Sequence, residues 1–473
     1  MKTKVSVVGL GYVGLCTAVC FASRGFHVYG VDVDVEKINS LREGRSETYE
    51  PQLQRYLNKA LKTRLFEPTV DLGSAVEKSS VTFVSVGTPS LDDGSIDLTY
   101  VKQSSVAIGA SLKEQSKWHL VVVRSTVIPT TCDSVVKPAI EQASGKPCGH
   151  KWGLCMNPEF LREGSAIHDT LYPDRIIIGE YDERSGSALE RLYRSFFRRK
   201  VPTKRMSMVN GELVKYANNA FLAMKVSFAN MIANLCETVP AADAGVVTSA
   251  IGLDKRIGQA FLNAGLGYGG SCFPKDIKAL TVFGRKQNID LPLVHATAAI
   301  NEEQPLRAID LAEKLVGPLS GKQIAVLGLA FKPHTDDIRE AVSIPIIKGL
   351  LQRHANIAVY DPKAIPQARR IFERSVTYAE SATECIRDSD VCILVTEWEC
   401  FRDLKPQEFA TLMKKPAIVD GRRLFDPSQF SQVKYACVGL GPNQKTRIAW
   451  APPRRGSQGG CRGAAPRLRF AKH

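Results

Sequence analysis

Residues 269–276 read GGSCFPKD and combine a thiol, a carboxylate and two adjacent glycines. Pro274 suits the first turn of a helix, which places Ser271 or Cys272 near the helix N-cap, where the helix dipole favours a thiolate. Asp276 lies one turn after Cys272 and shares its helix face. A thiolate can attack an aldehyde, and a nearby carboxylate can handle the proton of a water or hydroxyl group. The alternative for Cys272 is a buried structural cysteine, which is the default for the rest of the chain's 12 cysteines.

A second set of glycines lies near the N-terminus. Gly9, Gly11 and Gly14 follow a short β-branched segment and open a helical pattern, and Asp32 ends the next strand-like segment. This spacing permits a tight turn and the close approach of a pyrophosphate, whose charge the amides of the helix N-terminus can meet. A carboxylate at Asp32 can bond a ribose hydroxyl pair and would repel a 2′-phosphate. The pattern predicts dinucleotide binding with NAD favoured over NADP, against the alternatives of a glycine-rich loop and a solvated strand end.

Other polar residues occur at positions where chemistry is possible. Lys215 and Asn219 are four residues apart and share a helix face near the packed side, so Lys215 could stabilise an oxygen that develops negative charge. A solvated surface lysine is the commoner case. Glu159 follows a strand-like segment and could be a base or only a charge at a helix start. Ser125 and Thr126 lie at the expected carboxyl end of a strand, where ligands bind in open α/β sheets.

The elements that must position these residues alternate between strands and helices. Short apolar segments typical of buried strands lie at 4–9, 27–32, 81–86, 119–124 and 175–179, and again at 323–328, 356–361, 391–396 and 417–420. Strands that alternate with helical patterns predict βαβ units and parallel sheets. Residues 322–330 are similar to 4–11 but lack the later glycine.

The middle of the chain favours helix. Residues 210–239 contain no glycine or proline after Gly211. Apolar residues recur there at helical spacing, at Leu213, Ala217, Phe221, Met224, Phe228, Met231 and Leu235. We therefore predict an α/β fold with two Rossmann-like parallel-sheet domains joined by a long central helix and a helical middle domain. The expected divisions are 1–205, 206–316 and 317–442, followed by a tail at 443–473.

The composition is that of a globular protein with an excess of positive charge. Its 63 Lys and Arg against 48 Asp and Glu give 473 residues a formal net charge of +15. The segment 443–473 carries 8 of these charges and no acidic residue, which predicts a disordered basic tail. A basic run at 191–205 could indicate nucleic acid, but Tyr193, Phe196 and Phe197 fit the core face of a helix. We expect a solvated basic helix face there.

The sequence also bears on location and on metal binding. No run of about 18 apolar residues predicts a membrane span, and the N-terminus lacks the pattern of a signal peptide. The 12 cysteines form no CxxC pair and no zinc-ligand cluster, so we expect reduced thiols in the cytoplasm and no metal. The 8 histidines are scattered and are expected to be structural or at the surface.

Taken together, these motifs resemble those of the nucleotide-sugar dehydrogenase family, over residues 1 to about 442. The matching stretches are GLGYVGL from Gly9, VGTPS from Val86, RSTVIP from Arg124, NPEFLREG from Asn157, KYANNAFLA from Lys215, GYGGSCFPKD from Gly267, LAFKPHTDDIRE from Leu329 and DGRR from Asp420. The resemblance implies two successive oxidations of a primary sugar hydroxyl, with two NAD and one water, to give a uronic acid. The tail at 443–473 matches nothing in the family.

The resemblance also implies catalytic roles. Cys272 is similar to the nucleophile that captures the aldehyde as a thiohemiacetal, which is oxidised to a thioester and cleaved by water. Lys215 and Asn219 would stabilise the oxyanion, and Asp276 would organise water and proton transfer. Glu159 would assist the hydrolysis of the thioester.

Further residues are implied as ligand contacts. For NAD, these are Gly9, Gly11, Tyr12, Val13, Gly14, Asp32, Lys37, Thr88, Thr126, Glu163, Lys275 and Arg339, of which Thr126 would also position the water. For the nucleotide sugar, they are Glu159, Phe160, Leu161, Arg162, Glu163, Lys215, Asn219, Arg256, Phe261, Leu262, Asn263, Ala264, Gly265, Gly269, Phe331, Lys332 and Arg422. By this resemblance, the domain at 317–442 would hold UDP. Arg256 is similar to an arginine that reaches into a neighbouring subunit, which implies a homodimer built through the long helix.

Three hypotheses for the function follow. Residues 259–265, QAFLNAG, are similar to the family members that act on UDP-glucose, which favours that substrate. The second hypothesis is the same chemistry on GDP-mannose or a UDP-N-acetylhexosamine. The third, of another class, is a nucleic-acid-binding protein that uses the basic helix and tail, with an affinity that falls steeply with salt.

Overall fold

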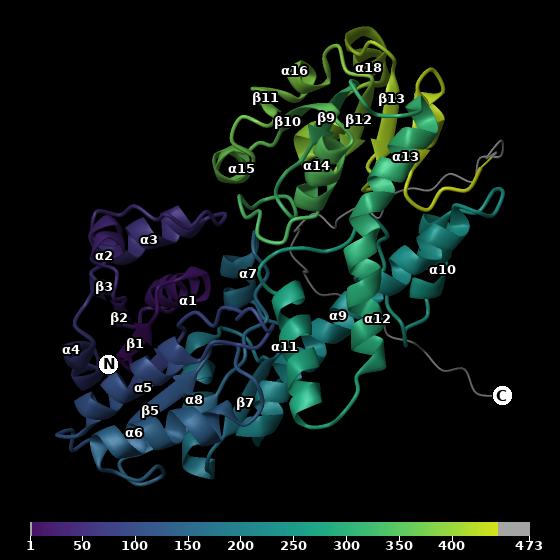
Figure 1. Ribbon diagram of the computed structural model, residues 1–473. Coiled ribbons are helices and arrows are strands. Elements are labelled where there is room, and N and C mark those ends of the chain that lie inside the picture. The colour runs from purple at the N-terminus through teal and green to yellow at the C-terminus, as the bar shows by residue number, and fades with distance from the viewer. Residues whose placement is uncertain (1, 443–473) are drawn as a thin grey trace, which may run out of the picture.

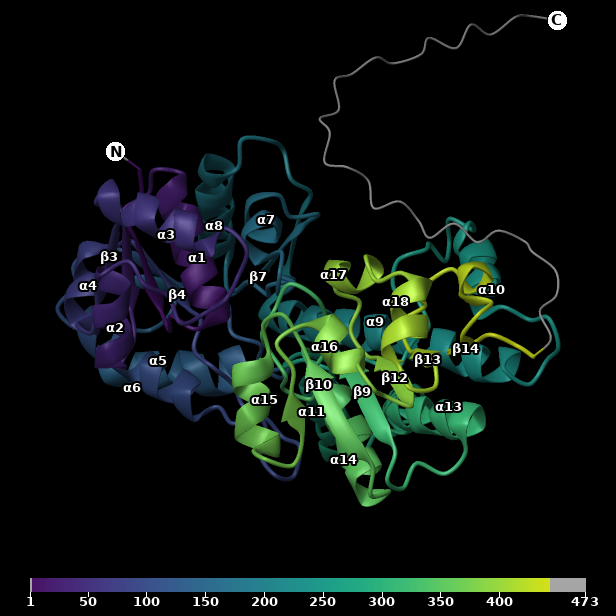
Figure 2. The same cartoon turned by 90° about the horizontal axis from the view of Figure 1, so that it is seen from above.

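The computed structural model describes residues 2–442, and the expected tail at 443–473 lies outside this range. Two sheet-containing units lie at opposite ends of the molecule, with helices between them (Figure 1). The long helix α9 (Met208–Cys236) and helix α11 (Phe273–Lys286) occupy the region between the units in the view from above (Figure 2). The predicted α/β fold with two Rossmann-like units and a helical middle region is confirmed.

The first unit contains an eight-stranded sheet in the order β3-β2-β1-β4-β5-β6-β7-β8. Its strands are β1 (Val5–Val8), β2 (Val28–Val31), β3 (Phe66–Thr69), β4 (Val81–Val84), β5 (His119–Val123), β6 (Trp152–Met156), β7 (Ile176–Glu180) and β8 (Thr203–Ser207). The chain order reverses between β1 and β4. Ligands of open α/β sheets bind at such a reversal, outside the carboxyl ends of the strands.

One pair of strands departs from the predicted parallel arrangement. β6 and β7 pair antiparallel, with Cys155 opposite Glu180 and Met156 opposite Gly179. An antiparallel neighbour begins at the edge where the previous strand ends, so it needs no crossover to the far edge. The connecting residues 157–175 therefore stay at the carboxyl edge of the sheet, where they can contribute to a ligand site.

The second unit contains a six-stranded sheet in the order β11-β10-β9-β12-β13-β14, and all of its strand pairs are parallel. Its strands are β9 (Gln323–Leu327), β10 (Asn356–Tyr360), β11 (Thr377–Tyr378), β12 (Val391–Leu394), β13 (Ala417–Asp420) and β14 (Lys434–Cys437). The order again reverses, here between β9 and β12. The two sheets thus share the arrangement that the repeated sequence at 322–330 predicts.

Helices cover both faces of each sheet. The first unit has α1 (Tyr12–Ser23), α2 (Val35–Arg42), α3 (Leu53–Lys62), α4 (Leu72–Lys78), α5 (Thr99–Leu112), α6 (Lys137–Ser144), α7 (Ala166–Leu171) and α8 (Glu183–Phe196). The middle adds α10 (Ala244–Gly252), α12 (Pro292–Glu303) and α13 (Arg307–Val316), and the second unit adds α14 (Ser343–Gln352), α15 (Ile365–Phe372), α16 (Ala382–Ile386), α17 (Glu399–Arg402) and α18 (Pro406–Leu412). Val5 and Val7 of β1 pack with α1 and α8, whereas Val8 packs with α4 and α5. This alternation follows from the two-residue period of a strand.

The predicted long helix is confirmed as α9. Its packed face, however, is not the predicted apolar stripe. The helix runs for 29 residues, and its buried positions include Lys215, Asn219, Ala223 and Ser227. Most of the predicted apolar stripe is exposed instead, with exposed fractions of 42–59% for Leu213, Phe221, Phe228, Met231 and Leu235. Small and polar residues line the packed side because α11 and α12 lie against it. Nothing else in residues 2–442 covers the apolar stripe.

The basic run at 191–205 lies on α8 and the segment after it. Tyr193 and Phe196 are buried, as predicted for the core face of a helix. Arg194 forms an ion pair with Glu190, and Arg205 forms one with Glu180, so part of the positive charge is neutralised locally. Within residues 2–442, no helix is both long enough and apolar enough to cross a membrane.

Candidate active site

The glycine motif forms a tight turn between β1 and α1. Gly9 has φ +89°, and a side-chain carbon on Gly14 would lie 1.8 Å from the Gly9 carbonyl oxygen. Gly11 precedes the first helical residue, and within residues 2–442 no atom other than those of Gly11 and its chain neighbours lies within 4 Å of the position that its Cβ would take. An anion can therefore approach the first amides of α1 closely, as a dinucleotide pyrophosphate requires.

Asp32 lies just beyond β2 and faces this turn. Its Oδ2 accepts hydrogen bonds from Leu10 N (2.9 Å) and Lys37 Nζ (3.1 Å), and its Oδ1 accepts one from Asp34 N (3.1 Å). These contacts hold the carboxylate beside the glycine turn, where a ribose would follow the pyrophosphate. The residues present therefore fit NAD, although Lys37 neutralises part of the negative charge of Asp32.

Hydrogen bonds join the residues that follow β4 to those that follow β5, next to the glycine turn. Thr88 Oγ1 donates to the Thr126 carbonyl at 2.9 Å, and Ser125 Oγ donates to the Val86 carbonyl at 2.7 Å. These bonds fix the two strand ends at the switch point between β1 and β4. Thr88 and Thr126 thus lie at the carboxyl edge, as the sequence predicts.

Glu50 links the glycine motif to residues 157–175, although no sequence pattern predicts this role. The Tyr12 hydroxyl donates to the buried Glu50 carboxylate, and Gly164 N donates to Glu50 Oε2 at 2.7 Å and to the Tyr12 hydroxyl at 3.0 Å. Burial raises the pKa of Glu50, while these hydrogen bonds oppose the rise. No motif marks Glu50, so only the folded chain shows that it links these two segments.

Cys272 is the residue immediately before α11, with Pro274 in the first turn, as the sequence predicts. Its side chain is exposed, yet the expectation of a favoured thiolate is wrong. Desolvation by the surrounding protein is the largest effect and raises the pKa of the Cys272 thiol. Glu159 and Asp276 raise that pKa further, and Lys215 opposes them. Desolvation therefore raises the pKa of the Cys272 thiol despite the nearby charge of Lys215, and the protonated thiol is favoured.

Lys215 is buried rather than solvated, and it is bonded to Glu159. Lys215 Nζ donates to Glu159 Oε1 at 2.7 Å and to the Glu159 carbonyl at 2.9 Å. Burial by itself lowers the pKa of Lys215, but the charges of Glu159 and Asp276 outweigh it and raise that pKa. Burial likewise opposes ionisation of Glu159, but Lys215 lowers its pKa. The pair is therefore ionised, and Lys215 is a fixed positive charge near the thiol.

Asn219 and Asp276 complete the polar surroundings of Cys272. Asn219 Nδ2 donates to Asp276 Oδ2 at 2.7 Å, and Lys275 Nζ lies 3.1 Å from Asp276 Oδ1. Asp276 is buried, and its position four residues after Cys272 places it one helical turn further along α11. The structure therefore brings Cys272, Lys215, Asn219, Asp276 and Glu159 into one cluster.

Glu163 connects residues 157–175 to the second unit. Ser271 Oγ donates to Glu163 Oε1 at 3.1 Å, Thr335 Oγ1 donates to Oε2 at 3.4 Å, and Arg339 Nη2 lies 3.7 Å from Oε1. Burial, followed by the charge of Asp337, raises the pKa of Glu163 to about 7. Glu163 thus lies next to the Cys272 loop and changes charge near neutral pH.

Close backbone packing fixes the loop before Cys272 against the second unit. A side-chain carbon on Gly269 would lie 2.2 Å from the Glu340 carbonyl, and one on Gly270, where φ is +85°, would lie 2.7 Å from the Phe331 ring. Arg422 donates to the carbonyls of Val395 (2.7 Å) and Gly267 (3.1 Å). Gly269, Phe331 and Arg422 are therefore brought to the same junction.

Several other predicted contacts border this junction. Burial lowers the pKa of Lys332, although Glu163 opposes that shift. Leu262, Ala264 and Gly265 are buried, whereas Asn263 is exposed and Phe261 adopts φ +65°. Gly265 N donates to Asn230 of α9 at 2.8 Å, which anchors the loop to the long helix.

The second sheet has a counterpart of Asp32 in Asp361, whose carboxylate makes more hydrogen bonds within the protein. Asp361, at the end of β10, accepts hydrogen bonds at Oδ2 from Leu329 N (2.7 Å), Ala330 N (3.0 Å) and Trp398 Nε1 (3.0 Å). Its Oδ1 accepts from Lys363 N and Ala364 N. All of its acceptor positions are therefore used within the protein, and a ribose would have to displace one of these bonds. The aspartate at the end of β10 is therefore less available to a ribose than Asp32, which accepts three hydrogen bonds.

The remaining candidates have partners of their own. Arg162 forms a bidentate pair with Asp169, and the Arg175 guanidinium lies 4.1 Å from the centre of the Phe160 ring. Leu161 N donates to Glu159 Oε2 at 2.6 Å. Arg256 lies in the loop after α10, pairs with Asp254, and has an exposed side-chain fraction of 89%. Within residues 2–442, no hydrogen bond or ion pair joins Arg256 to the cluster around Cys272.

Family models match this architecture along most of the chain. Residues 3–197 match the NAD binding domain of the UDP-glucose/GDP-mannose dehydrogenase family, 209–303 match its central domain, and 325–427 match its UDP binding domain. These three regions correspond to the first sheet, the helical middle and the second sheet.

Individual proteins give the same result. A UDP-glucose 6-dehydrogenase from Haloferax volcanii is 41% identical over 423 residues, which cover 89% of this chain and 97% of the relative. The structure of a UDP-glucose dehydrogenase from Pyrobaculum islandicum is 40% identical with a TM-score of 0.86, and covers 93% and 98% of the two chains. A UDP-D-ManNAc dehydrogenase from Pyrococcus horikoshii is 26% identical with a TM-score of 0.80, and covers 92% and 99%. The chain therefore belongs to the UDP-glucose/GDP-mannose dehydrogenase family and is an NAD-dependent oxidoreductase.

Proposed function

We propose that this protein oxidises the 6-hydroxyl group of UDP-glucose to the carboxylate of UDP-glucuronate, with two NAD and one water. The observation that carries this proposal is the cluster in which the Cys272 thiol lies beside a protonated lysine and the buried Asn219–Asp276 pair. The choice of UDP-glucose rests on similarity, since relatives named for this substrate reach 41% and 40% identity, against 26% for the UDP-D-ManNAc enzyme.

The first oxidation needs a positive charge near the reacting oxygen. NAD, when bound at the glycine turn and Asp32, supplies a hydride acceptor. Lys215 is held protonated by Glu159, so its role is to stabilise negative charge on the sugar oxygen rather than to remove a proton. Asn219 adds a neutral amide on the same face of α9, and we assign proton transfer from the hydroxyl group to Asp276, which is bonded to Asn219.

The second oxidation proceeds through Cys272. A bond forms between Sγ and the aldehyde carbon, the thiol proton passes to the surrounding polar groups, and the carbonyl oxygen becomes the hydroxyl of a thiohemiacetal. With a second NAD bound as the hydride acceptor, loss of a second hydride and of the hydroxyl proton would give a thioester. Water then adds to its carbonyl carbon, the carbon–sulfur bond breaks, and the thiol regains its proton.

Glu159 and Thr126 are assigned to the hydrolytic step. Glu159 is anionic, but its Oε1 is bonded to Lys215 and its Oε2 to Leu161 N. It can act on the water only if one of these hydrogen bonds is exchanged. Thr126 lies at the end of β5, where its side chain can hold that water.

We further propose a homodimer in which a second copy covers the exposed face of α9. Phe221, Phe228, Met231 and Leu235 of α9 are 42–59% exposed, and Val246 and Val247 of the adjacent α10 are also exposed. A contiguous apolar face of this kind favours association. Arg256 follows α10, so the same association would place it near the site of the other subunit.

The three regions of the chain fit the proposed reaction. We assign NAD binding to 1–205, dimerisation to 206–316 and UDP-sugar binding to 317–442, in line with the regions matched by the family models. We place the reaction in the cytoplasm, since the cysteines of residues 2–442 are free thiols, as in a reducing compartment.

A substrate panel tests the proposed reaction. NADH formation is measured with UDP-glucose, GDP-mannose and UDP-N-acetylhexosamines, each with NAD and with NADP. The expected result is activity with UDP-glucose and NAD and a yield of two NADH for each sugar consumed. Activity with GDP-mannose alone would overturn the assigned substrate, and a yield of one NADH would overturn the double oxidation.

A further inference from the structure

Two polar residues follow adjacent strands of the first sheet and are bonded to each other. Arg124 comes directly after β5 and Asn157 directly after β6, and Arg124 Nη1 donates to Asn157 Oδ1 at 2.7 Å. The last residues of these strands, Val123 and Met156, lie opposite each other in the parallel pairing. The side-chain bond therefore holds the two strand ends together at the carboxyl edge of the sheet, where ligands bind.

A third residue joins this pair from a helix. The Tyr193 hydroxyl of α8 donates to Asn157 Oδ1 at 2.5 Å and accepts from Arg124 Nη1 at 3.2 Å. Arg124, Asn157 and Tyr193, which we call the strand-end triad, are all buried. Because buried polar groups are nearly always hydrogen-bonded, the loss of one member leaves the others without partners.

Asn157 is held from three sides. Its Nδ2 donates to the Ile177 carbonyl of β7 at 2.8 Å, and its backbone N donates to the Val123 carbonyl of β5 at 2.8 Å. Its Oδ1 accepts the bonds from Arg124 and Tyr193. These contacts fix the direction in which the chain leaves β6.

The chain beyond these two strand ends carries the residues assigned to thioester hydrolysis. Thr126 is two residues after Arg124, and Glu159 is two residues after Asn157. A bond between Arg124 and Asn157 therefore also limits how far Thr126 and Glu159 can move apart. Hydrolysis requires the water and the carboxylate in one geometry, and a displacement of about 1 Å can lower a rate by about 100-fold.

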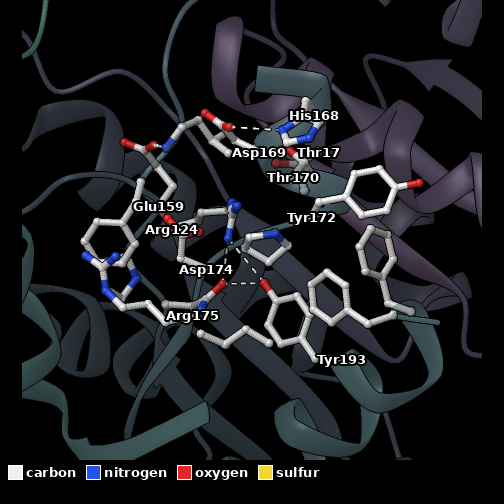
Figure 3. Close-up of a pocket in the computed structure, with 18 of the residues that line it drawn as sticks. Thr17, Arg124, Glu159, His168, Asp169, Thr170, Tyr172, Asp174, Arg175 and Tyr193 are labelled. Carbon is white, nitrogen blue, oxygen red and sulfur yellow. Dashed lines mark hydrogen bonds and ion pairs between the residues drawn. The ribbon is translucent and has the colours of Figure 1, made fainter. Parts of the chain in front are cut away.

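Packing beside Glu159 is incomplete. A cavity of about 120 Å³ is lined by Glu159 and by all three members of the strand-end triad, whereas Cys272 does not line it. Figure 3 shows the hydrogen bond between Arg124 and Tyr193, with Glu159 on the wall of the same cavity. Close packing normally holds a buried side chain, and a void removes those contacts. The position of the Glu159 segment therefore depends strongly on hydrogen bonds.

Arg124 also acts on Glu159 through its charge. Burial opposes ionisation of Glu159, Lys215 outweighs this effect, and Arg124 makes a smaller contribution that also lowers the pKa of Glu159. Arg124 forms no ion pair within residues 2–442, so no carboxylate neutralises its charge. If Lys215 turns towards the sugar oxygen, Arg124 still favours the anionic form of Glu159.

We propose that Arg124, Asn157 and Tyr193 are positioning residues for the hydrolysis of the thioester, because they hold Glu159 and Thr126 in the geometry that the attack of water requires. The inference rests on the function proposed above, in which Glu159 assists hydrolysis. In that step the water oxygen bonds to the thioester carbon. A proton of the water passes to Glu159 and then to the sulfur as the carbon–sulfur bond breaks. The triad serves this step and neither hydride transfer.

Tyr193→Phe tests the inference, because it removes one hydroxyl and keeps the ring in the core. Enzyme is mixed with UDP-glucose and saturating NAD, and NADH is followed through the first turnover into the steady state. Acid quenching and mass spectrometry of the intact protein give the fraction of Cys272 that carries the acyl group. The expected result is a burst of two NADH for each site at the wild-type rate, followed by loss of the acyl group about tenfold more slowly. The fraction of acylated Cys272 should increase accordingly.

A second variant and a control accompany it. Arg124→Met removes two of the three hydrogen bonds of the triad, together with the charge, and should slow loss of the acyl group by about 100-fold. Tyr378→Phe is the matched control, since the Tyr378 hydroxyl also donates to a carbonyl, that of Ala368, but lies in the second unit. It should lose the acyl group at the wild-type rate.

The outcomes separate this inference from the proposed function. Unchanged loss of the acyl group in Tyr193→Phe, or equal slowing of the burst and the steady state, overturns the positioning role even if Arg124→Met does not fold. Lower thermal stability with unchanged kinetics also overturns it, because the triad would then serve only the fold. Two NADH for each sugar from Cys272→Ser would instead contradict the thioester route itself.

Discussion

Lys215 Nζ lies 2.7 Å from Glu159 Oε1, and both side chains are buried, with exposed fractions of 4% and 7%. The lysine comes from α9 and the carboxylate from the loop after β6, so this ion pair joins the helical middle to the first sheet. Because each charge shifts the pKa of the other towards the ionised form, neither group is available as a simple acid or base at neutral pH. The pair supplies a fixed positive charge to the site.

Replacing Lys215 by Met should therefore affect catalysis and stability separately. We expect kcat to fall by about 10²–10³, the usual effect of removing a group that stabilises an oxyanion, with the NAD dissociation constant almost unchanged. The variant should also lose stability, by about 3–5 kcal/mol, because Glu159 is left as a buried unpaired charge.

The double variant Lys215→Met/Glu159→Gln separates these effects. It should regain most of the lost thermal stability, as judged by unfolding, but none of the lost kcat. A double variant as active as the wild type would show that Lys215 serves only the fold.

Cys272→Ser should abolish net production of the uronic acid while NAD still binds. A hydroxyl group does not form a thioester, so the second oxidation has no covalent intermediate to proceed from. NADH yield for each sugar and NAD binding by calorimetry are the measurements. Cys400→Ser is the control, since Cys400 is also exposed but lies on α17. Two NADH for each sugar in the Cys272 variant would rule out the thioester route.

Asp32→Ala should mainly weaken NAD binding, by about tenfold or more, since a charged hydrogen bond to a ribose hydroxyl is worth about 1.5–3 kcal/mol. The loss should appear in KM for NAD rather than in kcat. Asp34→Ala removes the neighbouring carboxylate, which caps α2 through Lys37 N, and serves as the comparison. Equal NAD affinities in Asp32→Ala and the wild type would refute the ribose contact.

Local motifs predicted the dinucleotide turn well because its parts are close in sequence. The glycines need only a strand before them and a helix after them, and Asp32 ends the very next strand. The position of Cys272 before α11 was likewise predicted from Pro274. In each case the physical requirement acts over a few residues, so the sequence carries it directly.

Properties set by distant contacts could not be predicted in this way. The link from Tyr12 through Glu50 to Gly164 joins three segments that share no sequence pattern. The pKa of the Cys272 thiol depends on Glu159, more than a hundred residues away in the chain. The apolar stripe of α9 predicts a helix correctly, but periodicity does not tell whether the apolar face contacts the same chain or another one.

Glu163 should make stability depend on pH near neutrality. Its pKa in the folded protein is raised to about 7 by burial and by Asp337, whereas an unfolded glutamate titrates near about 4.3. Between these values the folded state keeps a proton that the unfolded state has lost, so this group lowers the free energy of unfolding as pH rises from about 4.5 to 7.

The substitution Glu163→Gln removes the titrating carboxyl group and with it this pH dependence of the free energy of unfolding. The melting temperature of the variant, relative to that of the wild type, should therefore increase as pH is raised from 5 to 8. Glu340→Gln, at a side chain with an exposed fraction of 56%, is the control and should show no such trend. A constant difference between Glu163→Gln and the wild type across this range would contradict the raised pKa.

The proposed contribution of Arg256 to the site of the other subunit can be tested by mixing two inactive variants. Arg256 is 89% exposed in its own chain and pairs with Asp254, so Arg256→Ala should leave the fold intact and lose activity only if the residue reaches another subunit. In a mixed dimer of Arg256→Ala and Cys272→Ser, one site combines an intact Cys272 with an intact Arg256 from the partner. Random pairing makes half of the dimers mixed, so co-expression should restore about a quarter of wild-type activity. If Arg256 acts on its own subunit, each site of the mixed dimer keeps a defect and co-expression restores nothing.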